Sequence, residues 1–343
     1  MTKNRGGLRQ QDIARMAGVS QTVVSLVLNG RAASAGVAEE TQKRVRDIIE
    51  ERGYIPNVAA RSLRGGRNGI IGVHTFEPVF PVVVGNYYHD FLVGIEEEAV
   101  QMGQDLLLFA STQSEGGTRS IYGSGRNRLV LADGSIMLGM RTNDEELIRL
   151  SGENYPFVFI GKRDVSGVTF PYITADYEEA AASAVQLLHD HGHRTFGYLG
   201  LVNRIVPLDL RLHGFEQRAT SLGADGTAPW LLDPRRVTAR WLAERVAHGV
   251  TAFLIESIDL VEPFITAVSE LGIEIPADLS VVLLDVAPEN SVANGWSRIG
   301  LPRREQGRRS VALLLHLLNG DISPDHSETI ECEPPSLASV ADR

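Results

Sequence analysis

The first hydrophobic pattern in the chain consists of two short helical repeats within residues 10–28. Ile13 and Ala17 lie four positions apart, so they share one face of a helix. Val24, Val27 and Leu28 form a second apolar stripe with helical spacing. The pattern predicts two short amphipathic helices, each with one inward face.

The residues between these repeats favour a tight turn. Gly18 can adopt a left-handed conformation that a β-branched residue could not, and the Ser20 hydroxyl can cap the next helix. Gln21, Thr22 and Ser25 then point outward. Such a pair of helices is typical of the helix-turn-helix motif, whose second helix enters the DNA major groove. The alternative is a helical hairpin that binds no ligand.

The pattern then changes twice along the N-terminal region. A third helical pattern spans residues 39–52, and Tyr54 covers the core that three helices would form. Pro56 stops any further helix, and Asn57 can cap a two-turn helix that is too short to be stable alone. We therefore predict a helix-turn-helix head in residues 1–56, a hinge helix and linker in residues 57–68, and a body in residues 69–343.

From residue 69 onward, short and nearly continuous apolar strands alternate with helices. This pattern predicts parallel sheets that are covered on both faces. A second set begins near Tyr172, so we expect an α/β body of two lobes, of the periplasmic-binding-protein type, that binds a small ligand between them. The predicted strands are residues 69–76, 105–110, 134–139, 157–161, 195–200, 251–255 and 279–285, and the predicted helices are residues 88–102, 144–150, 175–189, 212–222, 260–271 and 307–318.

The distribution of charge matters more than the net charge of −10. Residues 1–68 hold 12 of the 33 Lys and Arg residues and 6 of the 43 Asp and Glu residues, a net charge of +6. The remaining residues hold 21 basic and 37 acidic side chains, a net charge of −16. A basic head on an acidic body attracts phosphate groups at one end only, which favours DNA as the partner of the head.

Other classes of protein are disfavoured by what the sequence lacks. It contains no apolar run of 18 residues, and its single cysteine, Cys332, suits a reducing cytoplasm, so we expect a cytoplasmic protein without a membrane segment. His191 and His193 have no Cys or carboxylate cluster at metal-ligand spacing, so we expect no metal site. Because no catalytic arrangement or cofactor motif can be recognised, we predict neither an enzyme nor a cofactor.

Residues 8–73 resemble the N-terminus of the lactose-repressor (LacI/GalR) family of bacterial transcription regulators. The matching segments keep the family spacing without a gap. They include Ala-Gly-Val-Ser at residues 17–20, Val-Leu-Asn-Gly at residues 27–30 and Gly-Tyr-Ile-Pro-Asn at residues 53–57. The body resembles the same family through Asp176, His-Gly-His-Arg at residues 191–194, Arg-Leu-His-Gly-Phe at residues 211–215, and Asp285 after Val281 and Val282.

The resemblance implies how the head meets DNA. In the family, the hinge helix folds on operator DNA, and a leucine at the place of Leu63 wedges into the minor groove. Leu26 stands where the family usually has an arginine that often contacts a base, so base reading rests on Gln21, Thr22 and Ser25, or Leu26 touches a thymine methyl group. The implied DNA-binding set is Gln21, Thr22, Ser25, Leu26, Asn29, Arg31, Tyr54, Asn57, Ala60, Leu63 and Arg64, with phosphate contacts from Arg5, Arg9, Arg31, Arg61 and Arg64.

The resemblance also implies an effector site between the lobes. Family members bind effector hydroxyl groups with an arginine and an aspartate that correspond to Arg211 and Asp285, a pair suited to a sugar or polyol. The alternative for both residues is an ion pair between lobes. Val286 and Ile258 replace residues that are often polar in the family, so the pocket is expected to be more apolar and its effector less polar than a sugar, or absent. Weaker candidates are Asp259, Trp296, Phe76 and Tyr88, whose aromatic members are more often core residues.

These observations predict a sequence-specific transcription regulator. We expect a repressor that binds a pseudo-palindromic operator as a homodimer and responds to a small-molecule effector. The rival hypothesis is a cytoplasmic solute sensor whose N-terminal helices bind a protein partner. A gel shift with the DNA upstream of the gene separates the two hypotheses.

Overall fold

The structure is a computed structural model that describes residues 8–28, 30–54, 67–77, 87–110, 119–123, 125–140, 142–224, 228–287 and 290–343. It divides into two compact units, residues 1–68 and residues 69–343, which we call the head and the body. Each unit is described by itself.

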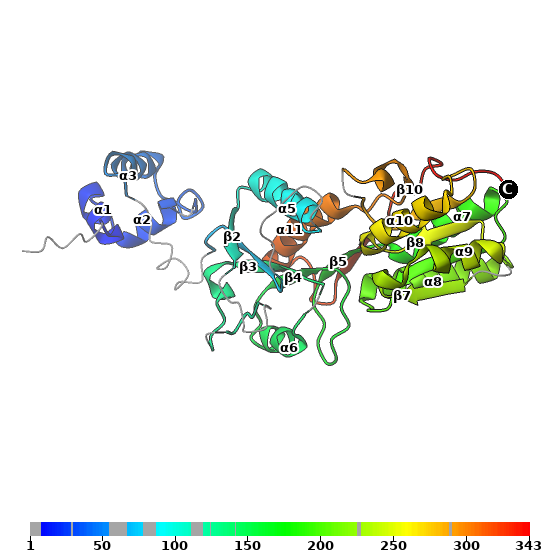
Figure 1. Ribbon diagram of the computed structural model, residues 1–343. Coiled ribbons are helices and arrows are strands. Elements are labelled where there is room, and N and C mark those ends of the chain that lie inside the picture. The colour runs from blue at the N-terminus through cyan, green and yellow to red at the C-terminus, as the bar shows by residue number, and fades with distance from the viewer. Residues whose placement is uncertain are drawn as a thin grey trace, which may run out of the picture. The chain divides into compact units, whose positions relative to one another are not determined.

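Three helices form the described part of the head (Figure 1): α1 (Gln10–Ala17), α2 (Gln21–Leu28) and α3 (Glu39–Glu51). They pack around Ile13, Val24 and Val45, whose side chains are fully buried. Gly18 adopts the left-handed conformation, with φ at 64°, and turns the chain between α1 and α2. The Val23 N–H donates to the Ser20 hydroxyl at 3.3 Å, which confirms the predicted cap of α2.

The body contains two sheets of parallel strands. The first belongs to the N lobe and has the strand order β11-β5-β4-β3-β1-β2, and the second belongs to the C lobe and has the order β10-β9-β8-β6-β7. The N-lobe strands are β1 (Ile70–Thr75), β2 (Asp105–Phe109), β3 (Gly134–Leu138), β4 (Phe157–Ile160), β5 (Tyr172–Ala175) and β11 (Ser327–Ile330). The C-lobe strands are β6 (Phe196–Leu201), β7 (Ala228–Leu232), β8 (Ala252–Ile255), β9 (Ser280–Leu283) and β10 (Ser297–Arg298).

Helices cover both faces of each sheet, as the continuous apolar strands require. In the N lobe, α5 (His89–Gln101) and α11 (Arg303–Asn319) share one core with one face of the sheet, and α6 (Asp144–Gly152) covers the other face. In the C lobe, α7 (Tyr177–Asp190) and α8 (Val206–Ser221) cover one face, and α9 (Ala239–Ala247) and α10 (Val261–Leu271) cover the other. This arrangement confirms the predicted two-lobed α/β fold class.

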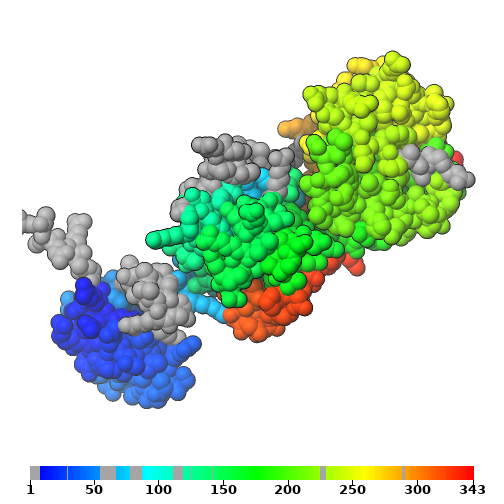
Figure 2. Space-filling view, turned by 90° about the horizontal axis from the view of Figure 1, so that it is seen from below, coloured from blue at the N-terminus to red at the C-terminus, as the bar shows by residue number. Residues whose placement is uncertain are grey.

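The chain passes between the lobes more than once. It leaves the N lobe after β5, returns after β10 to form α11 and β11, and ends in the C lobe, where Gly300 and Glu333 form a bridge. Figure 2 shows the result: the orange surface of α11 lies against the green surface of the N lobe, apart from the yellow C lobe. The carboxyl ends of parallel strands collect polar residues in folds of this kind.

Several predicted elements differ from the structure at their ends. The helix predicted at residues 212–222 is α8, which begins at Val206 because Pro207 is well suited to the first helical turn. The helix predicted at residues 307–318 is α11, which begins four residues earlier at Arg303. The sequence pattern did not predict α9, β5, β7, β10 or β11; β11, for example, is half-exposed and only four residues long.

Candidate DNA-reading helix and effector site

The outward face of α2 presents a small polar surface. Thr22 is exposed, while Gln21, Ser25 and Leu26 are half-buried. The Gln21 amide donates to the Gln10 side chain at 3.3 Å, which ties the start of α2 to the start of α1. Short polar groups held in this way on a rigid helix suit the reading of base edges.

The head that carries this helix also has exposed basic side chains. Exposed positions in the described part of the head include Arg9, Arg15, Arg31, Lys43, Arg44 and Arg46. Arg31 directly follows the turn that ends α2, where its N–H donates to the Leu26 carbonyl at 2.9 Å. Exposed arginines of this kind can contact phosphate groups without reading sequence.

The remaining predicted DNA contacts fall on one buried residue and on residues outside the described part of the head. Tyr54 is only 8% exposed and its ring packs in the head core, so its DNA contact stays a prediction. Asn29, the hinge residues Asn57, Ala60, Arg61, Leu63 and Arg64, and Arg5 lie outside the described residues, so their contacts stay predictions.

In the body, Asp285 lies just beyond the carboxyl end of β9 and is almost completely buried. Its carboxylate accepts the backbone N–H groups of Val286 at 2.8 Å and Ile258 at 3.3 Å, and an Arg303 guanidinium N–H at 2.6 Å. Arg303 begins α11 of the N lobe, so this contact is the ion pair between lobes that the sequence left open as an alternative. Val286 and Ile258, which were expected to make the pocket more apolar, present their backbone N–H groups to Asp285, and the polarity of the pocket stays a prediction.

Arg211 lies on α8 and is 4% exposed. Its Nη1 donates to the backbone carbonyl of Glu256 at 2.9 Å, and its guanidinium lies over the Tyr177 ring, 5.0 Å from the centroid. Arg211 and Asp285 therefore both lie at the strand ends of the C lobe, but no ion pair between them is present in the described structure.

A buried carboxylate that the sequence analysis missed lies behind Arg211. Glu256 follows β8 directly and is not exposed at all. It accepts two hydrogen bonds from Arg204 Nη1, at 2.7 and 2.8 Å, one from the Leu201 N–H at 2.8 Å, and one from the Tyr198 hydroxyl. Burial and the carboxylate beside it raise the pKa of Tyr198 well above its ordinary value. The sequence did contain a signal for Glu256: it is an acidic residue directly after an apolar strand, where parallel α/β folds bind ligands.

The aromatic candidates for the effector site are core residues. Phe76 is 2% exposed and stacks with Phe159, and Trp296 packs edge-on against Phe264. Tyr88 is buried, and its hydroxyl donates to Glu77. Since these rings are enclosed by protein, the core alternative is favoured for all three. Asp259 is exposed, and its N–H donates to the Ser257 hydroxyl at 3.3 Å.

The histidines considered as metal ligands have structural partners. His193 is fully buried between the Thr251 hydroxyl at 2.7 Å and the Ala341 carbonyl at 3.1 Å, and burial lowers its pKa to about 4. His191 lies 2.7 Å from Asp342. Among the described residues, no group of three or more His, Cys, Asp or Glu side chains is arranged to hold a metal ion.

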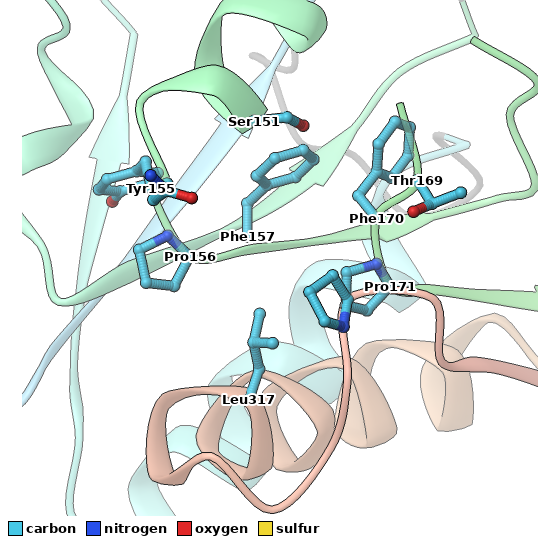
Figure 3. Close-up of a pocket in the computed structure, with 10 residues that line it drawn as sticks. Ser151, Tyr155, Pro156, Phe157, Thr169, Phe170, Pro171 and Leu317 are labelled. Carbon is cyan, nitrogen blue, oxygen red and sulfur yellow. The ribbon is translucent and has the colours of Figure 1, made fainter. Parts of the chain in front are cut away.

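A cavity lies at the amino ends of two N-lobe strands (Figure 3). It has a volume of about 210 Å³ and opens at the amino ends of β4 and β5, between Phe157, Phe170, Pro171 and Leu317. No charged side chain lines it. A polyol or an ion needs polar partners, so this apolar cavity is less suited to such an effector than the residues around Arg211 and Asp285.

A helix-turn-helix head and a two-lobed parallel α/β body define a DNA-binding regulator with a ligand-binding type of body. A family model described as "Bacterial regulatory proteins, lacI family" matches residues 10–57, and one described as "Periplasmic binding protein-like domain" matches residues 185–336. The chain belongs to the lacI family of bacterial regulatory proteins, as its resemblance predicted.

Individual relatives agree with this assignment. The chain is 25% identical to catabolite control protein A of Priestia megaterium over 80% of its own length and 81% of that protein. It is 30% identical to the sucrose operon repressor of Klebsiella pneumoniae over 65% of its own length and 64% of that protein. Among solved structures, a lac repressor dimer bound to operator and the anti-inducer ONPF has the same fold, with a TM-score of 0.68 and 21% identity over 98% of this chain and 100% of that one.

Family membership decides between the functional hypotheses. The family consists of DNA-binding transcription regulators, which confirms the predicted class and the prediction that the chain is not an enzyme. It also favours DNA over the rival idea of a protein partner for the N-terminal helices. In the described part of the chain, no helix is long and apolar enough to span a membrane.

Proposed function

We propose that the chain is a cytoplasmic homodimeric repressor that binds a pseudo-palindromic operator and releases it when a small metabolite binds between the lobes. The observation that carries this proposal is the outward polar face of α2 on a head of net charge +6. Two heads double the phosphate contacts and read two half-sites. Similarity to the sucrose operon repressor of Klebsiella pneumoniae supports repression as the sign of regulation.

Thr22→Ala is expected to weaken operator binding about tenfold, because Thr22 is the exposed polar residue of α2 and a lost base contact costs roughly 1–3 kcal/mol. Fluorescence anisotropy with the intergenic DNA upstream of the gene measures this. Thr266→Ala is the matched control, since the Thr266 hydroxyl on α10 donates to the Glu262 carbonyl of its own helix. If both variants bound the operator as tightly as the wild type, α2 would not be the helix that reads the bases.

The effector part of the proposal is supported by the residues around Asp285. Arg303 from the N lobe meets Asp285 from the C lobe, so a ligand that contacts either residue alters the contact between lobes. Ligand binding weakens DNA binding if the ligand prefers the lobe arrangement that DNA does not, and coupling of about 1–3 kcal/mol is typical. The lac repressor structure holds an anti-inducer together with operator, which supports a ligand-sensitive switch in a protein of this fold.

The dimer part of the proposal is supported by an exposed apolar surface on the N lobe. Strand β2 is an edge of its sheet, and Val100, Met102 and Leu106 at the junction of α5 and β2 are 73%, 44% and 40% exposed. An apolar patch beside an edge strand is a common site of association. A twofold interface places the same patch on both protomers, so each charge introduced there acts twice.

The double variant Val100→Glu, Leu106→Glu is expected to be monomeric at micromolar concentration and to bind a full operator at least about tenfold more weakly. Sedimentation velocity and anisotropy measure the two effects. Ile148→Glu on α6, on the opposite face of the same sheet, is the control because Ile148 is 42% exposed. A double variant that still sediments as a dimer would place the interface elsewhere.

A further inference from the structure

Three arginines from separate elements lie near the hydroxyl group of Tyr87, and one of them, Arg303, pairs with Asp285. Arg163 follows β4, Arg211 lies on α8, and Arg303 begins α11. Burial raises the pKa of the Tyr87 hydroxyl, while the charges of Arg303, Arg163 and Arg211 act to lower it and that of Asp285 acts to raise it. One phenol therefore lies close to three positive charges and one negative charge.

Each of the three guanidinium groups lies over an aromatic ring. Stacking occupies the face of a guanidinium and leaves its N–H groups directed outward in the plane, where they can bind a carboxylate or phosphate. The distances from guanidinium carbon to ring centroid are 4.7 Å for Arg303 over Tyr87, 5.0 Å for Arg211 over Tyr177 and 4.9 Å for Arg163 over Phe159.

Two of these arginines have a donor that is not used. The Nε atoms of Arg211 and Arg303 are buried without a hydrogen-bond partner in the described structure, although both side chains are more than nine-tenths buried. A buried donor without an acceptor costs free energy, and an acceptor on a bound molecule removes that cost. Arg211 does donate from Nη1 to the Glu256 carbonyl, and Arg303 donates from Nη2 to the Asp285 carboxylate.

Arg163 and Arg211 form no ion pair with a carboxylate among the described residues, whereas Arg303 does. Asp285 pairs with Arg303, and Glu77 lies near Arg163, whose pKa burial lowers. Glu256 is already paired with Arg204. Arg163 donates only to the backbone carbonyls of Lys162 and Gly139, which carry no charge. Of the three guanidinium groups, only that of Arg303 forms an ion pair within the described residues, and a partly buried positive charge is unfavourable until an anion joins it.

We propose that the effector of this regulator carries an anionic group, a carboxylate or a phosphate ester, and that Arg163 is the residue that selects it. This inference rests on the proposed function, because it names the chemistry of the effector at the same site. The anion supplies acceptors to the outward N–H groups and cancels the excess charge. A neutral sugar supplies acceptors but leaves the charge uncompensated.

The test compares ligands that share one sugar ring and differ at a single carbon. Glucose, glucose 6-phosphate and glucuronate carry a neutral, a phosphate and a carboxylate group there, and inorganic phosphate probes the anion alone. Each is added to the full-length chain at constant ionic strength, and the melting temperature is measured. We expect at least one of the three anionic probes to raise it by about 3 °C or more and glucose to raise it less.

Arg163→Gln is expected to reduce the affinity for the stabilising anion at least about tenfold, while Arg163→Lys retains most of it because the charge remains. Arg309→Gln is the matched control, since it removes one arginine charge from the exposed side of α11, where Arg309 pairs with Glu305. The melting temperature of each variant without ligand shows whether it is folded.

The outcomes separate this inference from the proposed function. Stabilisation by phosphate compounds alone, or by glucuronate alone, supports the inference and identifies which anion the site prefers. Equal or greater stabilisation by glucose, no stabilisation by any anionic probe, or an unchanged response in Arg163→Gln overturns it. Operator binding without ligand is measured on the same samples, and its loss in the wild type would instead refute the proposed function.

Discussion

Raising monovalent salt from about 50 to about 200 mM is expected to lower the affinity of the full-length chain for operator DNA by about three to five decades. The reason is counterion release. Each phosphate that the protein neutralises frees condensed cations from the DNA, and that gain disappears as salt rises. Two heads with a net charge of +6 each are able to engage the roughly six to ten phosphates that this range requires.

Anisotropy titrations at five salt concentrations give the slope of log affinity against log salt. Arg31→Ala is expected to reduce the magnitude of that slope by about one for each head, because Arg31 is exposed beside α2. Arg309→Ala on the body should leave the slope unchanged, since its partner is Glu305 of the same helix. A slope near zero for the wild type would be incompatible with this mode of binding.

The fold followed from local patterns, because its elements are short and nearly uniform. A strand such as β8, with all four residues buried, is visible as an apolar run without any knowledge of its neighbours. Helix starts were less visible: α8 begins at Val206 and α11 at Arg303, in segments whose first turns carry proline or arginine rather than apolar residues. The half-exposed strand β11 has no apolar run and owes its place to pairing with β5.

The candidate site was less predictable, because its contacts join residues far apart in the chain. Family resemblance identified Arg211 and Asp285, but no local pattern marks Arg303 as the partner of Asp285 across the lobes. The three arginines near Tyr87 also come from separate elements, so only the fold brings them together. Conversely, Trp296 and Phe76 are large aromatic residues near strand ends, and only their burial shows that they serve the core.

The second large effect concerns glycines at two helix crossings. Gly307 on α11 is expected to tolerate no side chain, because an added Cβ would overlap the carbonyl oxygen of Phe91 on α5. Gly214 on α8 meets the carbonyl oxygen of Glu178 on α7 in the same way. A carbonyl within a helix cannot rotate away, so the helices must separate and lose contact along their shared core.

Gly307→Ala and Gly214→Ala are each expected to lower the free energy of unfolding by about 3 kcal/mol, near the upper end of the usual cost of overpacking. Urea denaturation of the full-length chain measures this. Trp230, Trp241 and Trp296 all belong to the C lobe, so their fluorescence reports Gly214→Ala most directly, and circular dichroism reports Gly307→Ala.

Gly152→Ala is the matched control for both variants. Gly152 ends α6 with an ordinary backbone conformation, and an added Cβ would meet no atom of the described residues within 4 Å. Alanine is the better helix former by about 0.8–1.0 kcal/mol in a helix interior, so this variant should match or exceed the wild type in stability. If Gly307→Ala and Gly214→Ala were as stable as Gly152→Ala, the two helix pairs would not pack as closely as the structure shows. Close helix packing would then not explain the rigidity of the lobes that bring Arg303 to Asp285.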